Sequence, residues 1–348
     1  MSDSTQIRLS KKRRVYTIAE IGGNHEGSYE KALELTYKAI ETNVDAIKYQ
    51  IYTGDTLVNK LEDKERNEHF KRFELSKKEY LDLASKCKKA NIDFIASVWD
   101  PRKLNEFIPM MPYIKIGSGD MTSLHMIERL IHYEKPLIIS TGLSTYDEIE
   151  KVVAYIRKKS SYHRAKESII LLQCTAMYPI PDDQTNLAVI NRLSKKFDCL
   201  SGYSDHTTGI DALKIACGLG SSIIEFHFTD DKENTSFRDH QVSLTCDDVK
   251  ELHEYIDRID TLMGSDNKVA TEIEKETGHV RSFRRSIYAS RLIEKGQRIN
   301  NEDIISLRPC VDESSMKYEN IVGSITKQRI NALETVYDKI IQKDKKDE

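Results

Sequence analysis

The sequence lacks the paired cysteines that mark thiolate metal sites and disulfide frameworks. Its six cysteines are scattered, and no two of them have CxxC spacing. This pattern excludes a cluster of metal-bound thiolates and a disulfide-stapled fold. A reducing compartment is expected, so the cytoplasm is the predicted location.

Long apolar runs and a strong charge of one sign are also missing. No run reaches the roughly 20 apolar residues that a membrane-spanning helix needs. The basic stretch MSDSTQIRLSKKRR is followed by no apolar segment, so we expect no signal peptide and no membrane partner. The net charge is −3, with 31% charged and 39% hydrophobic residues. This balance predicts a soluble globular protein that does not bind nucleic acid.

Short apolar segments alternate with longer segments of helical periodicity. Eight strand candidates begin at Tyr16, Asp45, Asp93, Tyr113, Pro136, Ser168, Leu200 and Ser221. Amphipathic segments between them, such as 29–43 and 145–159, predict crossover helices that join parallel strands. Eight such units in about 250 residues match an α/β fold of the (β/α)8 TIM-barrel type. An open doubly wound sheet is the alternative, and the lack of a GxGxxG or Walker A loop disfavours it.

The pattern changes after Met263. Residues 264–283 are polar and charged, which is typical of a connector. The following segment RRSIYASRLIEKGQRINNEDIISLRP reads as short strands separated by turns. We therefore expect a barrel domain over 1–272, a linker over 273–283 and a small β-rich domain over 284–348.

The last strand candidate, SSIIEFHFTD, contains two ionisable residues. Side chains two positions apart on a strand share a face, so Glu225 and His227 point the same way. A Glu–His hydrogen bond that satisfies both groups is the simple explanation. The alternative is a functional site, because a buried charged carboxylate without a partner is costly.

The other strands favour the functional alternative. In a TIM barrel the active site lies at the carboxyl ends of the strands. Polar residues gather at those ends, which a purely structural core does not require. The strand-end residues are Glu20, Lys48, Gln50, Ser97, Lys115, Ser118, Ser140, Ser204, His206, Glu225 and His227, with Tyr178 after the sixth strand.

These residue types suggest a division of labour. Two lysines with a ring of hydroxyls suit an anion that carries phosphate and carboxylate groups. The imidazoles of His206 and His227 suit a divalent metal, and oxygen ligands without a thiolate favour Mn²⁺ or Mg²⁺, with Co²⁺ as a competitor. Glu20 and Glu225 can then handle protons. A single barrel lysine, however, can equally be an ordinary salt-bridge partner.

Seven motifs occur in an order that resembles the sialic acid synthase family. They are IAEIGGNHEG, DAIKYQ, KIGSGD, LIISTGLST, QCTAMYP, GYSDHT and IIEFHFT, and the resemblance runs from Val15 to Val322. The carboxy-terminal segment is similar to the antifreeze-like (SAF) domain that ends these enzymes. The resemblance implies an N-acetylneuraminate synthase-like transferase. Such an enzyme condenses phosphoenolpyruvate with an N-acylated hexosamine, such as N-acetylmannosamine, to give a nine-carbon 2-keto acid and phosphate.

The resemblance also implies roles for individual residues. His206 and His227 match metal-binding histidines, and Glu20 and Glu225 match the acids near the metal. Positions that hold phosphoenolpyruvate are matched by Lys48, Ser97, Lys115, Ser118, Ser140 and Ser204. Positions on the sugar side are matched by Gln50, Asp120, Tyr178 and Asp239. Arg308 matches an arginine that one subunit inserts into the barrel of its partner, which implies a domain-swapped homodimer.

Several positions depart from the family pattern, and most of them are expected near the sugar or the swapped domain. Phe237-Arg238 stands where a Gly-Pro often precedes the matched aspartate, and Phe226 replaces a basic residue. Two other functions remain open. A Schiff-base aldolase would use an inward lysine and leave the histidines idle. A non-catalytic sugar-binding protein would need none of the ionisable strand ends.

Overall fold

The computed structural model describes residues 13–343 except 234 and 236, and it divides into two compact units. The first unit ends at Gly264 and the second begins at Ser265. The predicted boundaries at 272 and 284 remain predictions, and two short helices, α12 (Glu272–Glu276) and α13 (His279–Ser282), lie in the segment that we expected to be a connector.

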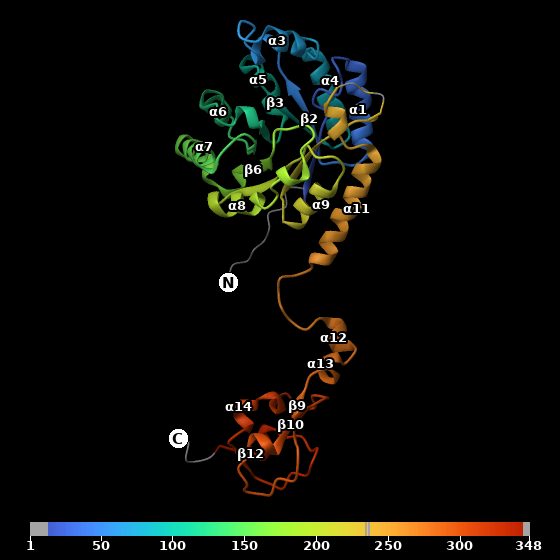
Figure 1. The fold of residues 1–348 in the computed structure, drawn as a ribbon. Coiled ribbons are helices and arrows are strands. Elements are labelled where there is room, and N and C mark those ends of the chain that lie inside the picture. Colours follow the sequence, from blue (N-terminus) through green and yellow to red (C-terminus); the bar gives the residue numbers. More distant parts are fainter. Residues whose placement is uncertain (1–12, 234, 236, 344–348) are drawn as a thin grey trace. The chain divides into compact units, whose positions relative to one another are not determined.

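The first unit contains eight parallel strands in the hydrogen-bonded order β3-β2-β1-β8-β7-β6-β5-β4. The two end strands, β3 and β4, contact each other, so the sheet curls into a nearly closed barrel (Figure 1). This confirms the TIM-barrel prediction, with every expected strand present. The strands are β1 (Tyr16–Glu20), β2 (Ala46–Ile51), β3 (Asp93–Val98), β4 (Ile114–Ile116), β5 (Leu137–Ser140), β6 (Ile169–Cys174), β7 (Leu200–Ser204) and β8 (Ile223–His227).

Helices surround the strands, as Figure 1 shows. Several begin with a capping box; in α7 the Thr145 side chain and the Glu148 side chain each bond the backbone N–H of the other residue. The helices are α1 (Tyr29–Glu41), α2 (Gly54–Leu57), α3 (Lys64–Lys71), α4 (Lys77–Lys89), α5 (Leu104–Phe107), α6 (Leu124–Ile131), α7 (Tyr146–Lys159), α8 (Val189–Phe197), α9 (Asp211–Gly218), α10 (Asp239–Val242) and α11 (Cys246–Met263). Among the described residues, no helix combines the length and the apolar character needed to cross a bilayer.

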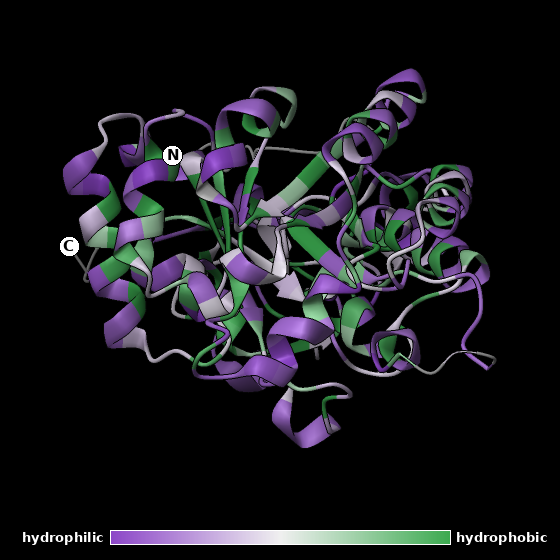
Figure 2. Cartoon of the chain, turned by 90° about the horizontal axis from the view of Figure 1, so that it is seen from above, coloured by the Kyte–Doolittle hydropathy of each residue, from purple (hydrophilic) through white to green (hydrophobic). Residues whose placement is uncertain are grey.

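The core has two layers, one on each face of the strands. Apolar residues such as Tyr49 and Phe226 point outward against the helices. A second cluster, which includes Ile18, Ala46 and Ile223, fills the barrel interior near the amino ends of the strands. Figure 2 shows the same division, with hydrophobic strands at the centre and hydrophilic residues on the outer helix surfaces.

The inward-facing side chains change character along each strand. Because side chains alternate between faces, the residue two positions after an interior apolar one also points inward. Thus Ile18 is followed by Glu20, Ala46 by Lys48, and Ile223 by Glu225. The apolar lower layer stabilises the barrel, and the polar upper layer lies at the carboxyl ends of the strands.

The second unit is small and has its own hydrophobic cluster, which includes Ile287, Ile293 and Val336. It contains two antiparallel pairs, β9 (Ser286–Ala289) with β10 (Ile304–Leu307), and β11 (Ile325–Thr326) with β12 (Ile341–Gln342). Among the described residues of this unit, the short helices α12 and α13 precede β9, and a further short helix, α14 (Tyr318–Ile321), follows β10. The unit agrees with the small β-rich domain expected after the barrel.

Candidate active site

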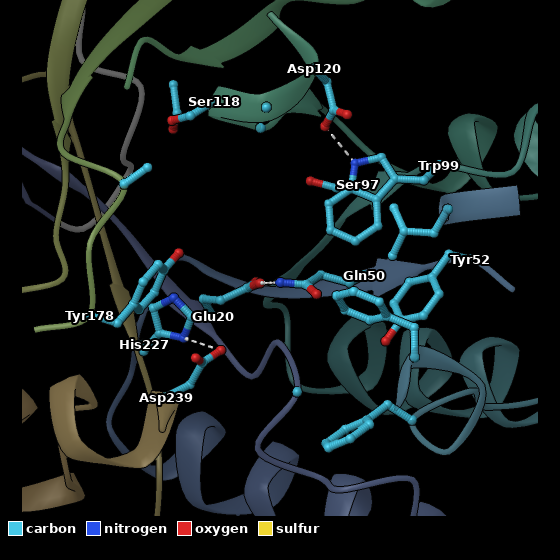
Figure 3. Close-up of a pocket in the computed structure, with 18 of the residues that line it drawn as sticks. Glu20, Gln50, Tyr52, Ser97, Trp99, Ser118, Asp120, Tyr178, His227 and Asp239 are labelled. Carbon is cyan, nitrogen blue, oxygen red and sulfur yellow. Dashed lines mark hydrogen bonds and ion pairs between the residues drawn. The ribbon is translucent and has the colours of Figure 1, made fainter. Parts of the chain in front are cut away.

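A cavity of about 910 Å³ opens at the carboxyl ends of the barrel strands. The strand register places its residues at one level, since Glu20 pairs with both Lys48 and His227 across the sheet. All predicted site residues except Arg308 line this cavity. Figure 3 labels several of them, including Glu20, Gln50 and His227. They are Glu20, Lys48, Gln50, Ser97, Lys115, Ser118, Asp120, Ser140, Tyr178, Ser204, His206, Glu225, His227 and Asp239.

Two buried ion pairs form the floor of the cavity. Lys48 Nζ lies 2.7 Å from Glu20 Oε2, and Gln50 Nε2 donates to Glu20 Oε1 at 2.7 Å. Lys48 and Glu20 are only 4% and 2% exposed. Burial alone would lower the pKa of Lys48, but the Glu20 and Glu225 carboxylates outweigh it and raise that pKa. Lys48 is therefore a permanent cation at neutral pH.

The second pair joins Lys115 to Glu225. Lys115 Nζ lies 3.4 Å from Glu225 Oε1 and donates to Ser140 Oγ at 2.8 Å, while Ser204 Oγ donates to Glu225 Oε1 at 3.1 Å. Burial would raise the pKa of Glu225, but Lys115 and Lys48 hold it below its ordinary value. The simple Glu–His hydrogen bond is therefore wrong, because the described partners of Glu225 are a lysine and a serine.

The two imidazoles lie side by side above this floor. Their ring centroids are 5.3 Å apart, and the Tyr178 ring packs 3.9 Å from that of His206. His206 Nδ1 lies 3.0 Å from the Thr175 carbonyl oxygen, which can only accept, so Nδ1 carries the proton and Nε2 keeps its lone pair. Burial and the neighbouring His227 lower the pKa of His206 to about 3, so this ring is neutral.

This arrangement fits a divalent cation with open coordination positions. His206 Nε2 is a free lone pair, and the buried His227 Nδ1 has no hydrogen-bond partner among the described residues. The Cys174 thiol, 3.9 Å from His206 Nδ1, has its pKa raised by burial and offers no thiolate. The described residues hold no group of three or more His, Cys, Asp or Glu side chains arranged for a metal. Further ligands would therefore come from substrate or water.

The residues predicted for the sugar side lie around the rim. Asp120 accepts a hydrogen bond of 2.6 Å from Trp99 Nε1, and burial raises its pKa. Asp239 Oδ2 lies 3.7 Å from His227 Nδ1, and its Oδ1 accepts from Arg238 Nε at 3.2 Å. Asp239 thus faces an imidazole of the candidate metal pair as well as the cavity (Figure 3).

Arg308 is the one predicted site residue that does not line this cavity. It follows β10 in the second unit, where its Nε donates to the Phe283 carbonyl oxygen at 2.8 Å and its guanidinium lies over the Phe283 ring. All the residues that line the cavity belong to the first unit. The predicted role of Arg308 in a partner subunit remains a prediction.

Tyr178 was predicted from the sequence, but the aromatic residues on the opposite side of the cavity were not. An aromatic cluster at the rim is formed by residues on and just after α3, just after β2 and β3, and before α10. The residues are Tyr52, His69, Phe70, Phe73, Trp99 and Phe237. The motif HFKRF at 69–73 was a usable signal, since aromatic residues in a polar loop segment often mark a binding surface.

Known proteins resemble this chain over both units. Residues 35–268 match the NeuB family, and residues 284–341 match the SAF domain. An N,N'-diacetyllegionaminic acid synthase from Legionella pneumophila is 34% identical, with 91% of this chain and 92% of that protein covered. An N-acetylneuraminate-9-phosphate synthase from Drosophila melanogaster is 35% identical, with 68% of this chain and 66% of that protein covered.

Solved structures give the same result. The crystal structure of an N-acetylneuraminic acid (sialic acid) synthetase from Leptospira borgpetersenii superposes with a TM-score of 0.70 at 31% identity. The match covers 76% of this chain and 90% of that one. The resemblance seen in the seven ordered motifs is thereby confirmed. This chain belongs to the NeuB family of sialic acid synthase-like enzymes and carries a carboxy-terminal SAF domain.

Proposed function

We propose that this protein condenses phosphoenolpyruvate with the open-chain form of an N-acylated hexosamine to give a nine-carbon 2-keto acid and phosphate. One observation carries the proposal. Two buried lysines, two buried carboxylates and two neighbouring imidazoles converge on one cavity, from the carboxyl ends of five of the eight barrel strands. The printed names of the relatives support the reaction class, and they differ in the acceptor sugar. The synthesis of N-acetylneuraminate from N-acetylmannosamine is the form of this reaction with which other acceptor sugars can be compared.

The lysines would hold the anionic substrate. Phosphoenolpyruvate carries a carboxylate and a phosphate, and Lys48 and Lys115 offer two fixed positive charges with Ser97, Ser118 and Ser140 at the same level. The two glutamates compensate these charges in the ligand-free site. Binding of the anion would loosen each lysine from its carboxylate, which leaves Glu20 and Glu225 available for the reacting sugar and water.

The bond changes balance with these groups. C3 of phosphoenolpyruvate attacks the sugar aldehyde and forms the new C–C bond, water adds at C2, and the C2–O bond to phosphate breaks. The lowered pKa of Glu225 makes it a carboxylate at neutral pH, suited to accept a proton from that water, and Glu20 is the other candidate. Lys48 and Lys115 counter the anionic charge throughout.

His206 and His227 would hold the divalent metal, which we propose to be Mn²⁺, with Mg²⁺ or Co²⁺ as competitors. When bound, this ion supplies Lewis acidity that polarises the aldehyde. Asp239 Oδ2, 3.7 Å from His227 Nδ1, would add negative charge beside the ion while the other carboxylate oxygen stays with Arg238.

A homodimer completes the proposal. Arg308 directly follows the short strand β10 in the second unit, where it contacts Phe283. Its planar guanidinium suits bidentate binding of substrate oxygens. We propose that it enters the barrel of the partner subunit.

The structure argues against the alternatives raised by the sequence. A Schiff-base lysine needs a lowered pKa to be nucleophilic, whereas that of Lys48 is raised and Lys115 is paired with Glu225. A non-catalytic sugar-binding protein has no need of two buried ion pairs, whose desolvation is costly.

The test is a product assay with phosphoenolpyruvate and a panel of N-acylated hexosamines in the presence of Mn²⁺. Phosphoenolpyruvate labelled with ¹⁸O at its bridging oxygen should deliver that label to phosphate, because the C2–O bond breaks. Trapping by borohydride with pyruvate should give no covalent adduct. Label retained in the keto acid, or an adduct on Lys48 or Lys115, would reject the proposed chemistry.

A further inference from the structure

One side of the cavity, opposite the imidazoles, is lined by aromatic residues. Figure 3 shows Tyr52 and Trp99 on one side of the cavity and Tyr178 and His227 on the other. The aromatic wall lies on and just after α3, just after β2 and β3, and before α10, and it consists of Tyr52, His69, Phe70, Phe73, Trp99 and Phe237. The ionic floor accounts for the anion, and the aromatic wall has no part in that chemistry.

The rings of the aromatic wall form one continuous surface. Each packs against the next at distances typical of aromatic pairs. From one end to the other, the centroid distances are 5.5 Å for Trp99–Tyr52, 5.6 Å for Tyr52–Phe70, 5.4 Å for Phe70–His69, 4.8 Å for His69–Phe73 and 4.9 Å for Phe73–Phe237. The wall therefore offers a connected apolar face rather than isolated rings.

The end of the aromatic wall formed by Phe73 and Phe237 packs against Gly23, in the segment that follows β1. A Cβ atom on Gly23 would lie 2.7 Å from Phe237 Cε1 and 3.6 Å from Phe73 Cδ1, so only glycine leaves room for the Phe237 ring. Gly23 follows β1, two residues after Ile21, and itself lines the cavity. This close packing against Gly23 keeps the Phe237 ring at the cavity rather than in solvent.

The charges near the wall are already engaged. Arg66 stacks its guanidinium 5.7 Å from the centre of the Phe70 ring. Arg238 pairs with Asp239, and its guanidinium lies 4.7 Å from the centre of the Tyr178 ring. Five of the six wall residues are half-buried, and Tyr52 is buried. Binding of a ligand to these faces would be stabilised mainly by the apolar area removed from water, and less by charge.

We propose that the aromatic wall is a subsite for an apolar substituent of the acceptor sugar. This inference rests on the proposed function. The aldehyde end would face the imidazoles, and the carbons remote from it would face the wall. The acceptor class is then a hexosamine whose remote carbons carry methyl-bearing groups, a 6-deoxy methyl or a second acylamido group, in place of hydroxyl or phosphate. Phe237 and Phe73 are the residues that would determine this specificity.

The first experiment compares matched acceptors. They are N-acetylmannosamine, its 4-acetamido-4,6-dideoxy derivative and its 6-phosphate, each with phosphoenolpyruvate and Mn²⁺. We expect kcat/KM for the dideoxy derivative to exceed that for N-acetylmannosamine by about 10–200-fold, the range for one or two apolar contacts. Phe237→Ala and Phe73→Leu should each lower that ratio several-fold. Tyr37→Ala, an aromatic that is 47% exposed on α1 and outside the cavity, should leave the ratio unchanged.

The second experiment measures binding without turnover. Trp99 is the only tryptophan of the chain and belongs to the wall, so its fluorescence reports a ligand there. We expect the dideoxy derivative to change this signal at lower concentration than N-acetylmannosamine, and Phe237→Ala to remove the difference. Binding can be measured in this way even if no product forms. A lack of product would reject the proposed function but would leave the subsite proposal intact. Equal binding of the two sugars, or tighter binding of the 6-phosphate, would overturn the subsite.

Discussion

The buried pair of Lys48 and Glu20 allows stability and function to be separated in one experiment. Lys48→Met removes the cation and leaves the Glu20 carboxylate, 2% exposed, with Gln50 as its remaining described donor. Removing one partner of a buried ion pair costs about 3–5 kcal/mol, because the other charge stays buried without compensation. For a unit of this size that corresponds to a fall in Tm of roughly 6–20 °C.

The double variant Lys48→Met with Glu20→Gln removes both charges. Replacing a whole buried pair by neutral groups of similar volume is often neutral or stabilising, so most of the lost stability should return. The glutamine can still accept the hydrogen bond that Gln50 now donates to Glu20 Oε1. Activity with phosphoenolpyruvate should stay lost in both variants, because the double variant restores no cation.

The assay is urea unfolding followed by Trp99 fluorescence, which reports the barrel unit in which that residue lies. Steady-state kinetics with phosphoenolpyruvate are measured in parallel. A double variant as unstable as Lys48→Met would refute the reasoning, since the uncompensated carboxylate would then not be the cause. A single variant that loses less than about 1 kcal/mol would show that the pair behaves as if exposed.

Four further predictions address other parts of the protein. Chelation should abolish turnover and Mn²⁺ should restore it, and a folded His227→Ala should show no restoration; full activity in excess chelator would reject the metal. Lys115→Ala should lower kcat/KM for phosphoenolpyruvate by roughly 10–150-fold, the value of a charge-assisted contact of about 1.5–3 kcal/mol, and an unchanged constant would contradict its role in binding the anion. Burial lowers the pKa of His25 to about 4, so between about pH 6.5 and pH 4 the unfolded chain binds a proton that the folded chain does not bind. The free energy of unfolding should therefore fall from pH 6.5 toward pH 4 by up to about 1.4 kcal/mol per pH unit. His25→Asn keeps an acceptor for the Gly27 N–H and should flatten this slope when stability is measured by urea unfolding at each pH. Mixed Arg308→Ala and His227→Ala subunits should recover up to about a quarter of wild-type activity if Arg308 acts in trans in a dimer; no recovery in proven heterodimers would mean that it does not.

Much of the barrel was readable from local sequence. Strand segments such as 169–174 are nearly continuous apolar runs, because both faces of a parallel strand are buried. The switch from Ile223 to Glu225 and His227 along one inward face was visible by counting residues in steps of two. The level at which the polar residues meet then followed from the rule that barrel strands are parallel.

The partners of those residues could not be read in the same way. That Glu225 bonds Ser204 and Lys115 rather than His227 depends on the stagger between β7, β8 and β4, which no local pattern encodes. The neutral state of His206 depends on its burial and on the carbonyl of Thr175, 31 residues earlier in the chain. Such facts exist only once distant segments are packed together.

The sequence by itself determined the architecture, because the hydrophobic periodicity repeats eight times, and the chemistry of the cavity floor, because its residues lie at fixed positions on strands. Only the tertiary structure decided what the rest of the cavity is made of. The aromatic wall gathers residues from 52 to 237 whose spacing along the chain follows no period. It exists because α3 and the segment before α10 fold over the same barrel mouth, and because Gly23 leaves space for Phe237.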